Sequence, residues 1–229
     1  MFVKSKNTIL TMEGREFKDA MYDGLSKLLK ALANPFRLEI IEMLSQGEKN
    51  VEGIVQTTSL TFANASQHLQ VLKNNNIVKS RKEKQYVYYT LVNEKFLSLY
   101  QHVVKYAGQE IAELEKTLNR QREDNKALNA LSLGELETKL QNKDVLLMDV
   151  RPETEYEFGH ITGALSVPMK ELMSKLKNIS KNKEIIAYCR GPFCVLADEA
   201  VKTLSEQGYN VRRLDEGYPE WKMRQMERN

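Results

Sequence analysis

The feature that most constrains this sequence is the stretch of residues 185–197, IIAYCRGPFCVLA. Mostly apolar residues ending at Tyr188 predict a short buried strand, and the apolar spacing after Cys194 predicts a helix. The loop between them begins with Cys189, at the expected carboxyl end of the strand. Backbone N–H groups converge at such a position and the helix dipole is positive, so the loop favours an anionic sulfur. Because the thiolate is the reactive form of cysteine, we predict that Cys189 is a nucleophile with a lowered pKa.

The C-terminal half alternates short apolar runs with segments of helical spacing. This alternation predicts an α/β domain with a mainly parallel sheet. The expected strands are 145–150, 164–167, 184–188 and 211–214, and the expected helices are 132–140, 169–176, 195–207 and 218–226. Ligands bind at the carboxyl ends of the strands in such sheets, which is where Cys189 is expected.

Three elements of this half resemble the rhodanese family. They are DVRPETEYEFGHITGA at 149–164, the cysteine loop, and the closing segment LDEGYPEW at 214–221. The resemblance covers about residues 128–229 and implies a persulfide on Cys189. Glu216 stands where the family usually has a second glycine, which leaves the shape of that turn open.

The length of the loop separates two chemistries known for this fold. The phosphatase branch has an arginine after cysteine and five further residues, because a guanidinium must hold phosphate bidentately. Position 195 is valine here, so the resemblance implies a sulfurtransferase-type loop. The residues that complete this loop after Cys189 are Arg190, Gly191, Pro192, Phe193 and Cys194. Arg190 could attract thiosulfate or another anion, whereas Pro192 lacks an N–H donor.

Further residues are candidates for roles around the loop. Asp149 and Arg151 follow the strand expected beside the active one, and we expect Arg151 and Glu155 to form an ion pair that frames the site. A direct contact between Arg151 and substrate is the alternative. Cys194 has two interpretations: it attacks a persulfide on Cys189 to form a bridge, or it is a small apolar residue of the helix.

The first half is mainly helical. The expected helices are 17–32, 35–47, 51–57, 62–74 and 94–118, after a loosely ordered arm at 1–15. Asn34 with Pro35, and Thr61, have the chemistry of helix starts, and two short helices joined by a tight turn form the helix-turn-helix pattern. Residues 77–91 predict a hairpin with a basic tip. We interpret it as a wing, with a solvated turn as the alternative.

The segments ALANPFRLEIIEML and LTFANASQHLQVLKNNNIV, followed by the hairpin, resemble the ArsR-type winged helix repressors over about residues 20–118. The resemblance implies a homodimer, formed by the first and last helices, on a double-stranded DNA operator. Carried over by position, the candidate DNA-binding residues are Phe62, Asn64, Ser66, Gln67, His68, Arg81, Lys82 and Lys84. Asparagine and glutamine suit adenine, and arginine and lysine suit phosphates. For Phe62 and His68 the alternative is packing within the motif.

Composition limits the remaining possibilities. Many ArsR-type proteins sense metals through cysteines in the third helix, but GEKNVEGIV has none, and a lone His102 on the last helix offers too few ligands. We therefore predict no metal and no cofactor. No apolar run approaches the roughly 20 residues of a membrane span, so we expect a cytoplasmic protein without a membrane partner. A net charge of +3 is a weak signal for nucleic acid, so DNA binding must rest on the motif.

We therefore predict two domains: a mainly α winged helix domain for DNA binding and dimerisation at 1–120, a charged linker at 121–127, and an α/β rhodanese-like domain at 128–229. The predicted function is a DNA-binding transcriptional regulator, of repressor type, that senses or transfers sulfane sulfur from thiosulfate, polysulfide or persulfide. An active sulfurtransferase tethered to a DNA-binding module is the alternative. A third possibility is an inert rhodanese domain that stabilises the dimer or binds a partner.

Overall fold

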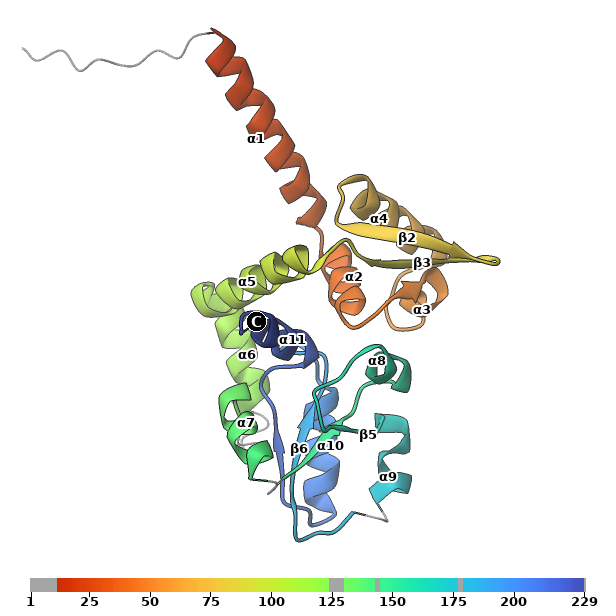
Figure 1. The fold of residues 1–229 in the computed structure, drawn as a ribbon, viewed down its shortest axis with the longest axis vertical. Coiled ribbons are helices and arrows are strands. Elements are labelled where there is room, and N and C mark those ends of the chain that lie inside the picture. The colour runs from red at the N-terminus through yellow and green to blue at the C-terminus, as the bar shows by residue number, and fades with distance from the viewer. Residues whose placement is uncertain (1–11, 124–129, 143–144, 177–178, 229) are drawn as a thin grey trace, which may run out of the picture.

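The computed structural model describes residues 12–123, 130–142, 145–176 and 179–228, and these form two regions, each with its own sheet (Figure 1). No helix among these residues is long and apolar enough to cross a membrane.

The N-terminal region packs helices around a three-stranded antiparallel sheet of order β1-β3-β2. Its elements are α1 (Met12–Leu32), α2 (Pro35–Ser45), β1 (Lys49–Asn50), α3 (Val51–Val55), α4 (Phe62–Asn74), β2 (Val78–Glu83), β3 (Tyr86–Leu91), α5 (Glu94–Glu110) and α6 (Ala112–Glu123). The side chains of Asn34 and Thr61 accept backbone N–H groups at the starts of α2 and α4, as predicted. The core is built from α2, α3, α4 and the start of α5, including Ile40, Ile41, Ile54, Leu69, Leu72 and Phe96.

Two predictions for this region are wrong. The helix α1 begins at Met12, so the second part of the expected arm is helical. The single helix expected over 94–118 is two helices, because Ile111 has an extended backbone (φ −98°, ψ 101°). The helix α6 then turns back so that Leu118 lies against Gly108 of α5. It continues to Glu123, inside the expected linker, whose last residues lie outside the described ranges.

The C-terminal region has a parallel sheet of order β5-β4-β6-β7. Its elements are α7 (Leu133–Gln141), β4 (Val145–Asp149), α8 (Glu153–Phe158), β5 (Leu165–Ser166), η1 (Met169–Glu171), α9 (Leu172–Lys175), β6 (Glu184–Tyr188), α10 (Leu196–Glu206), β7 (Val211–Arg213) and α11 (Tyr218–Met226). The predicted strands and helices are all present with shifts of a few residues, although α9 is shorter than expected. The helix α8 was not predicted.

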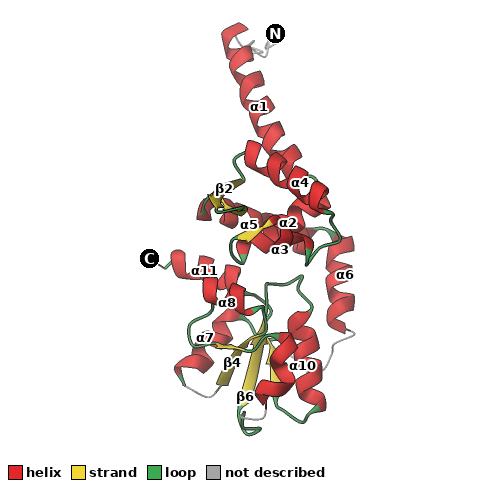
Figure 2. Cartoon of the chain, turned by 90° about the vertical axis from the view of Figure 1, so that its right-hand side faces the viewer, coloured by secondary structure: helices red, strands yellow, loops and turns green. Residues whose placement is uncertain are grey.

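Helices cover both faces of this sheet, which gives three layers. Apolar residues of α9 and α10 form one core cluster with β4 and β6. Apolar residues of α7 and α11 form a second cluster on the opposite face. Figure 2 shows α10 and α7 on opposite sides of β4 and β6. This is the predicted α/β architecture.

The two regions meet at the carboxyl end of the parallel sheet. Figure 1 shows α11 beneath α5 and α8 beneath α2 and α3. Lys222 of α11 lies 3.1 Å from Glu94 of α5, and Gln101 Nε2 donates to Glu220 Oε1 at 3.3 Å. The end of β6, which leads into the cysteine loop, therefore faces the helix-turn-helix region.

Candidate functional site

The cysteine loop connects the end of β6 to the start of α10, as predicted. Its turn is made by Gly191, whose φ of +144° suits glycine. Cys189 Sγ lies 3.4 Å from the carbonyl oxygen of Cys194, so the two ends of the loop approach each other. Cys189 is 2% exposed and Cys194 is 9% exposed. Both thiols are therefore enclosed, and a reagent can reach Cys189 only if the loop moves.

The closing segment of the C-terminal region holds this loop in place. A Cβ atom on Gly217 would lie 2.5 Å from the carbonyl carbon of Arg190, so only glycine allows this close approach. Glu216, the departure from the rhodanese pattern, accepts a hydrogen bond from the N–H of Leu133 at 3.1 Å. The turn therefore keeps Gly217, the glycine that touches the loop. Glu216, which stands where the family usually has its second glycine, caps the start of α7.

The acidity of the two cysteines differs from the prediction. Burial raises the pKa of the Cys189 thiol, because its sulfur belongs to the apolar cluster beneath α10. A hydrogen bond from Cys189, together with the N–H groups of Arg190 and Leu196, lowers the pKa of Cys194 to about 7. The predicted lowered pKa of Cys189 is therefore wrong for the reduced loop, in which Cys194 is the more acidic thiol.

The framing ion pair also has different partners. Both carboxylate oxygens of Glu155 accept hydrogen bonds from Arg190, at 3.0 and 2.8 Å, and Oε1 also accepts one from Lys49 at 3.0 Å. Arg151 pairs instead with Asp149 at 2.6 Å. The predicted pair between Arg151 and Glu155 is wrong. The positive charge of Arg190 is directed at a carboxylate, which weakens its expected attraction for an anionic sulfur donor.

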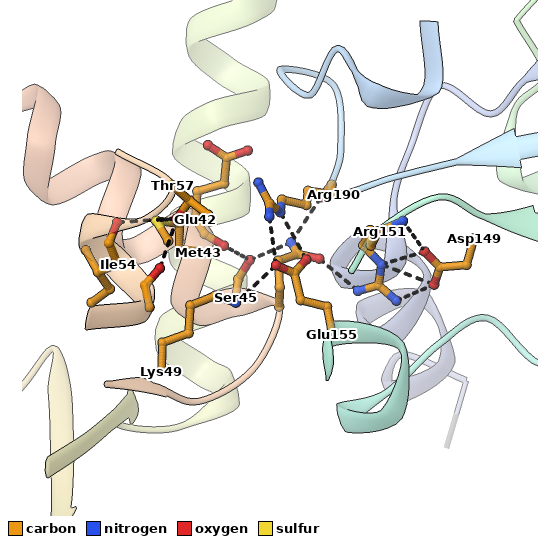
Figure 3. A network of polar contacts seen from close by, with 12 residues as sticks. Glu42, Met43, Ser45, Lys49, Ile54, Thr57, Asp149, Arg151, Glu155 and Arg190 are labelled. Carbon is orange, nitrogen blue, oxygen red and sulfur yellow. Dashed lines mark hydrogen bonds and ion pairs between the residues drawn. The ribbon is translucent and has the colours of Figure 1, made fainter. Parts of the chain in front are cut away.

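A buried polar network joins the loop to α2 (Figure 3). Arg151 Nη1 donates to Gln46 Oε1 at 3.0 Å, and Gln46 Nε2 donates to the carbonyl oxygen of Arg190 at 3.1 Å. Gln46 directly follows α2 and has no exposed surface. Asp149 also accepts the hydroxyl of Tyr188 at 2.6 Å. Asp149 and Arg151 therefore contact the loop through Gln46, which holds the Arg190 carbonyl oxygen. Neither Asp149 nor Arg151 is exposed to a substrate.

A cavity of about 550 Å³ lies beside the loop, between the two regions. Its walls include Pro192 and Phe193 of the loop, Gln101 of α5 and Glu220 of α11. Burial raises the pKa of Glu220, although its carboxylate accepts the N–H of Gly217 at 2.9 Å. The cavity has the size of a small-molecule site at a domain junction.

The predicted DNA-binding residues of α4 lie on or near its outer surface. Phe62 is 54% exposed, so it does not pack within the motif. Asn64 and Gln67 are exposed, and Ser66 and His68 are half-buried. The ring of His68 lies 5.8 Å from that of Phe36, and burial lowers the pKa of His68. His68 therefore packs in part against α2, and the other four positions are available to DNA.

The hairpin is tied to α4, since Lys73 donates to Ser80 Oγ at 2.7 Å. Arg81 is engaged within the protein: it donates to Glu48 at 2.8 Å, it pairs with Glu83, and its guanidinium lies 4.8 Å from the ring of Tyr88. Lys82 and Lys84 are exposed near the tip. The hairpin thus has two exposed lysines near its tip, whereas the charge of Arg81 is already balanced by Glu48 and Glu83.

Several residues that connect the two regions were not predicted, namely Gln46, Lys49, Glu94, Gln101, Glu220 and Lys222. Polar residues between two helices and glutamates on a C-terminal helix are common in protein sequences. Their positions along the chain therefore do not indicate a contact between the two regions. In the part of the chain that the structure describes, no group of three or more histidine, cysteine or acidic side chains could hold a metal.

Comparisons with known proteins cover both regions. Residues 34–80 match the family of bacterial regulatory proteins of the arsR type, and residues 132–224 match the rhodanese-like domain. The HTH-type transcriptional regulator Rv0324 of Mycobacterium tuberculosis is 36% identical over 209 residues, which are 90% of each chain. The thiosulfate sulfurtransferase GlpE of Coxiella burnetii is 31% identical over 84 residues, 36% of this chain and 77% of that protein.

Among solved structures, the homodimeric winged helix-turn-helix DNA-binding domain Mb0332 of Mycobacterium bovis has 32% identity and a TM-score of 0.40, with coverage of 49% of this chain and 95% of that chain. The similarity to Rv0324 extends over both regions and the two family matches occur in the predicted order. The chain therefore belongs to the arsR family of transcriptional regulators and carries a rhodanese-like domain at its C-terminal side.

Proposed function

We propose that this regulator binds a two-fold DNA operator as a homodimer, and that sulfane sulfur accepted by Cys189 weakens its operator binding. The observation that carries this proposal is the hydrogen bond of 3.1 Å from Gln46 Nε2 to the carbonyl oxygen of Arg190. It joins the loop that would hold the persulfide to the end of α2, one of the helices on which α4 packs. A change in the loop can therefore reach the DNA-binding helix through direct contacts.

The DNA-binding part rests on α4 and the hairpin. Gln67 and Asn64 can form paired hydrogen bonds to adenine in the major groove, and Lys82 and Lys84 can contact phosphates. The half-buried Ser66 can contact the nearby backbone, with Phe62 against a base edge. Arg81 contributes less, because Glu48 and Glu83 balance its charge.

A dimer is supported by apolar side chains that remain exposed on α1 and α5 of the N-terminal region. They are Phe17, Met21, Leu25 and Leu29 on α1, and Leu99, Val103 and Tyr106 on α5. Apolar patches of this kind mark interaction surfaces. A two-fold dimer would place two copies of α4 at neighbouring turns of the major groove.

The sulfur-dependent part rests on the tight packing of the loop. Cys189 is 2% exposed, so an added sulfur atom needs space that a close-packed interior does not contain. Arg190 contacts the N-terminal region through both its carbonyl group and, by way of Glu155, its guanidinium. A loop displaced by sulfur would lose contacts that the unmodified loop makes, which is the differential interaction that coupling between two sites requires.

The donor would be thiosulfate, polysulfide or a low-molecular-weight persulfide, which could approach through the cavity beside Pro192 and Phe193. Because Cys189 is enclosed, we expect slow modification and a lasting product. An active sulfurtransferase tethered to DNA requires instead that donor and acceptor exchange rapidly at Cys189.

Operator titrations test the proposal. The operator is first selected from random double-stranded DNA with the purified full-length protein, and the native protein and Cys189→Ser are then titrated with and without polysulfide. We expect polysulfide to weaken binding by the native protein about 5- to 100-fold, the usual range of such coupling, and to leave Cys189→Ser unchanged. An unchanged dissociation constant for native protein that polysulfide has modified at Cys189, as shown by mass spectrometry, overturns the sensor. Rapid thiocyanate formation from thiosulfate and cyanide would then identify the tethered enzyme.

A further inference from the structure

The two cysteines of the loop share one cradle of backbone N–H groups. The Cys189 thiol donates to the carbonyl oxygen of Cys194 at 3.4 Å, and the N–H groups of Arg190 and Leu196 lower the pKa of the Cys194 thiol. In a loop of the rhodanese type, convergent N–H groups would hold the outer sulfur of a persulfide, which is anionic. Here the sulfur of a second cysteine already occupies part of that cradle. The interpretation of Cys194 as a small apolar helix residue does not account for these polar contacts.

Cys189 is the more deeply buried cysteine of the loop, with 2% of the residue exposed. The backbone N–H groups of Gly191 and Ala197 partly offset the effect of burial on its pKa, and its thiol donates to the carbonyl oxygen of Cys194 at 3.4 Å. Burial opposes ionisation at this position. Cys189 therefore needs a base close by. Its thiol is directed at the carbonyl group of Cys194 at 3.4 Å, and the sulfur of that residue, with its lowered pKa, is the basic side chain offered by the same loop.

We propose that Cys194 is a second catalytic residue of the loop, which first removes the proton from Cys189 and then closes a disulfide with it. This inference rests on the proposed function, since it requires that a sulfane sulfur reaches Cys189.

The first step is sulfur uptake. The Cys194 thiolate takes the proton of the Cys189 thiol while Cys189 Sγ attacks the terminal sulfur of a hydropolysulfide. A bond forms between Sγ and that sulfur, and the sulfur–sulfur bond of the donor breaks. The remainder of the donor leaves as a shorter polysulfide or as hydrosulfide and carries away the negative charge. The products are a persulfide on Cys189 and a protonated Cys194.

The second step closes the loop. Cys194 Sγ attacks Sγ of Cys189, a bond forms between them, and the bond from Cys189 to the outer sulfur breaks. The outer sulfur leaves with the proton of Cys194 and its own proton as hydrogen sulfide. Two cysteine sulfurs are oxidised and one sulfane sulfur is reduced, so the step needs no further oxidant.

Bridging would change the geometry that reaches the DNA-binding region. A disulfide bond is about 2.0 Å long, shorter than any contact between two sulfur atoms that are not bonded to each other. Closing it must draw Cys189 and Cys194 together and displace the residues between them. Arg190 is one of these residues, and its carbonyl oxygen is held by Gln46. We therefore expect the hydrogen bond between Gln46 and the Arg190 carbonyl oxygen to break when the disulfide forms.

Intact-protein mass spectrometry tests the inference. The reduced full-length native protein, Cys194→Ser and Cys189→Ser are treated with sodium polysulfide, and then denatured and alkylated with N-ethylmaleimide without reductant. At completion we expect the native protein to have lost two hydrogens, to carry no maleimide and to have released one sulfide per chain. Cys194→Ser should carry one maleimide on one extra sulfur atom at Cys189. Cys189→Ser should carry a maleimide on Cys194 without extra sulfur.

The rate of sulfur uptake tests the proton transfer. Serine is close to cysteine in size and is not basic at neutral pH, so Cys194→Ser should gain its sulfur about 100-fold more slowly than the native protein forms its bridge, the usual contribution of a general base. A thermal melt equal to that of the native protein shows that this variant is folded, and Cys194→Ala repeats the measurement if it is not.

The outcomes separate the inference from the proposed function. A native protein that keeps an alkylated persulfide on Cys189 and an alkylated Cys194 overturns the inference and leaves the proposed function intact. A native bridge without any sulfur uptake by Cys194→Ser overturns the order of steps, since Cys194 would then be the first acceptor. Absence of added sulfur in every variant and of a bridge in the native protein overturns both.

Discussion

Arg190 of the cysteine loop lies against Glu155, with both guanidinium–carboxylate distances at or below 3.0 Å. Lys49 approaches the same carboxylate from the N-terminal region at 3.0 Å. Glu155 is 1% exposed, so one buried anion is shared by a cation from each region. This ion triad and the Gln46 hydrogen bond act on the same residue of the loop from different sides.

Replacing Glu155 with glutamine should destabilise the protein by about 3 kcal/mol, because removal of one partner leaves two cations unpaired at a buried junction. Urea unfolding of the two full-length proteins measures the difference. Glu137→Gln is a matched control, since Glu137 pairs with Arg224 and Arg228 near the surface and such pairs contribute at most about 1 kcal/mol. Equal losses for the two variants would contradict a special role for the junction.

The same carboxylate predicts a pH dependence. Burial alone would raise the pKa of Glu155, but the hydrogen bonds and charges of Arg190 and Lys49 hold it below its ordinary value. The unfolded chain therefore binds a proton more readily than the folded one, so this contribution is complete above the unfolded pKa of about 4.3 and is lost as the pH falls through the folded pKa. The difference in unfolding free energy between native protein and Glu155→Gln should be constant above about pH 6 and should shrink below about pH 4. A difference that grows in acid would exclude this assignment.

The elements of the fold could be predicted where local chemistry decides them. Asn34, Thr61 and Ser132 accept backbone N–H groups at helix starts, and these contacts depend only on residues within one turn. The break at Ile111 could not be predicted, because an apolar spacing continues through it and packing of α6 on α5 overrides that pattern. The short helix α8 has no capping side chain to mark its start.

Of the site, the cysteine loop could be predicted from the sequence, but the contacts around the loop could not. The position of Cys189 follows from a strand, a tight turn and a helix, which are local features. The ion-pair partners of Glu155 are decided by tertiary packing, which brings Arg190 and not Arg151 close to its carboxylate. The third member of the cluster, Lys49, comes from the other region of the chain. The raised pKa of Cys189 likewise follows from the apolar cluster around its sulfur, which no pattern in residues 189–194 reveals.

The wing should contact DNA through Lys84 more than through Arg81. Lys84 has a left-handed backbone (φ 54°), so Lys84→Asn, which tolerates that conformation, is the suitable variant. It should weaken binding to all DNA sequences and reduce the slope of log K against log salt by about one. Arg81→Ala should change the slope less, because Glu48 and Glu83 already balance its charge. Operator titrations at several salt concentrations measure both slopes, and a larger change for Arg81→Ala would refute this assignment.

In α4, Gln67→Ala should relax base preference. Gln67 is exposed on α4, and a bidentate contact to one base contributes about 1–3 kcal/mol of discrimination. We expect binding to the selected operator to weaken while binding to random DNA stays unchanged. Gln70→Ala is the control on the same helix, since the side chain of Gln70 is hydrogen-bonded to Asn74 at 2.6 Å. Equal effects of the two variants would remove Gln67 from base recognition.

Gln46→Met should separate DNA binding from the sulfur response. Methionine matches glutamine in length but makes none of its three side-chain hydrogen bonds, so the Arg190 carbonyl, one Arg151 N–H and the Ser45 hydroxyl oxygen lose a partner. Each buried group left unsatisfied costs about 1–3 kcal/mol. Gln46 lies in the buried junction and not on α4 or the wing, so operator affinity without polysulfide should stay within about twofold, less than 0.5 kcal/mol. Sulfur uptake by Cys189 should persist, because Gln46 contacts the carbonyl of Arg190 and neither thiol.

The weakening of operator binding by polysulfide should then fall from its native value toward none. The measurement is the operator titration with and without polysulfide, together with mass spectrometry to show that the variant carries the same modification as native protein. If modified Gln46→Met loses operator affinity as fully as modified native protein, the signal does not pass through this hydrogen bond. Glu155→Gln, which breaks the link through Lys49, then becomes the variant that should lose the response.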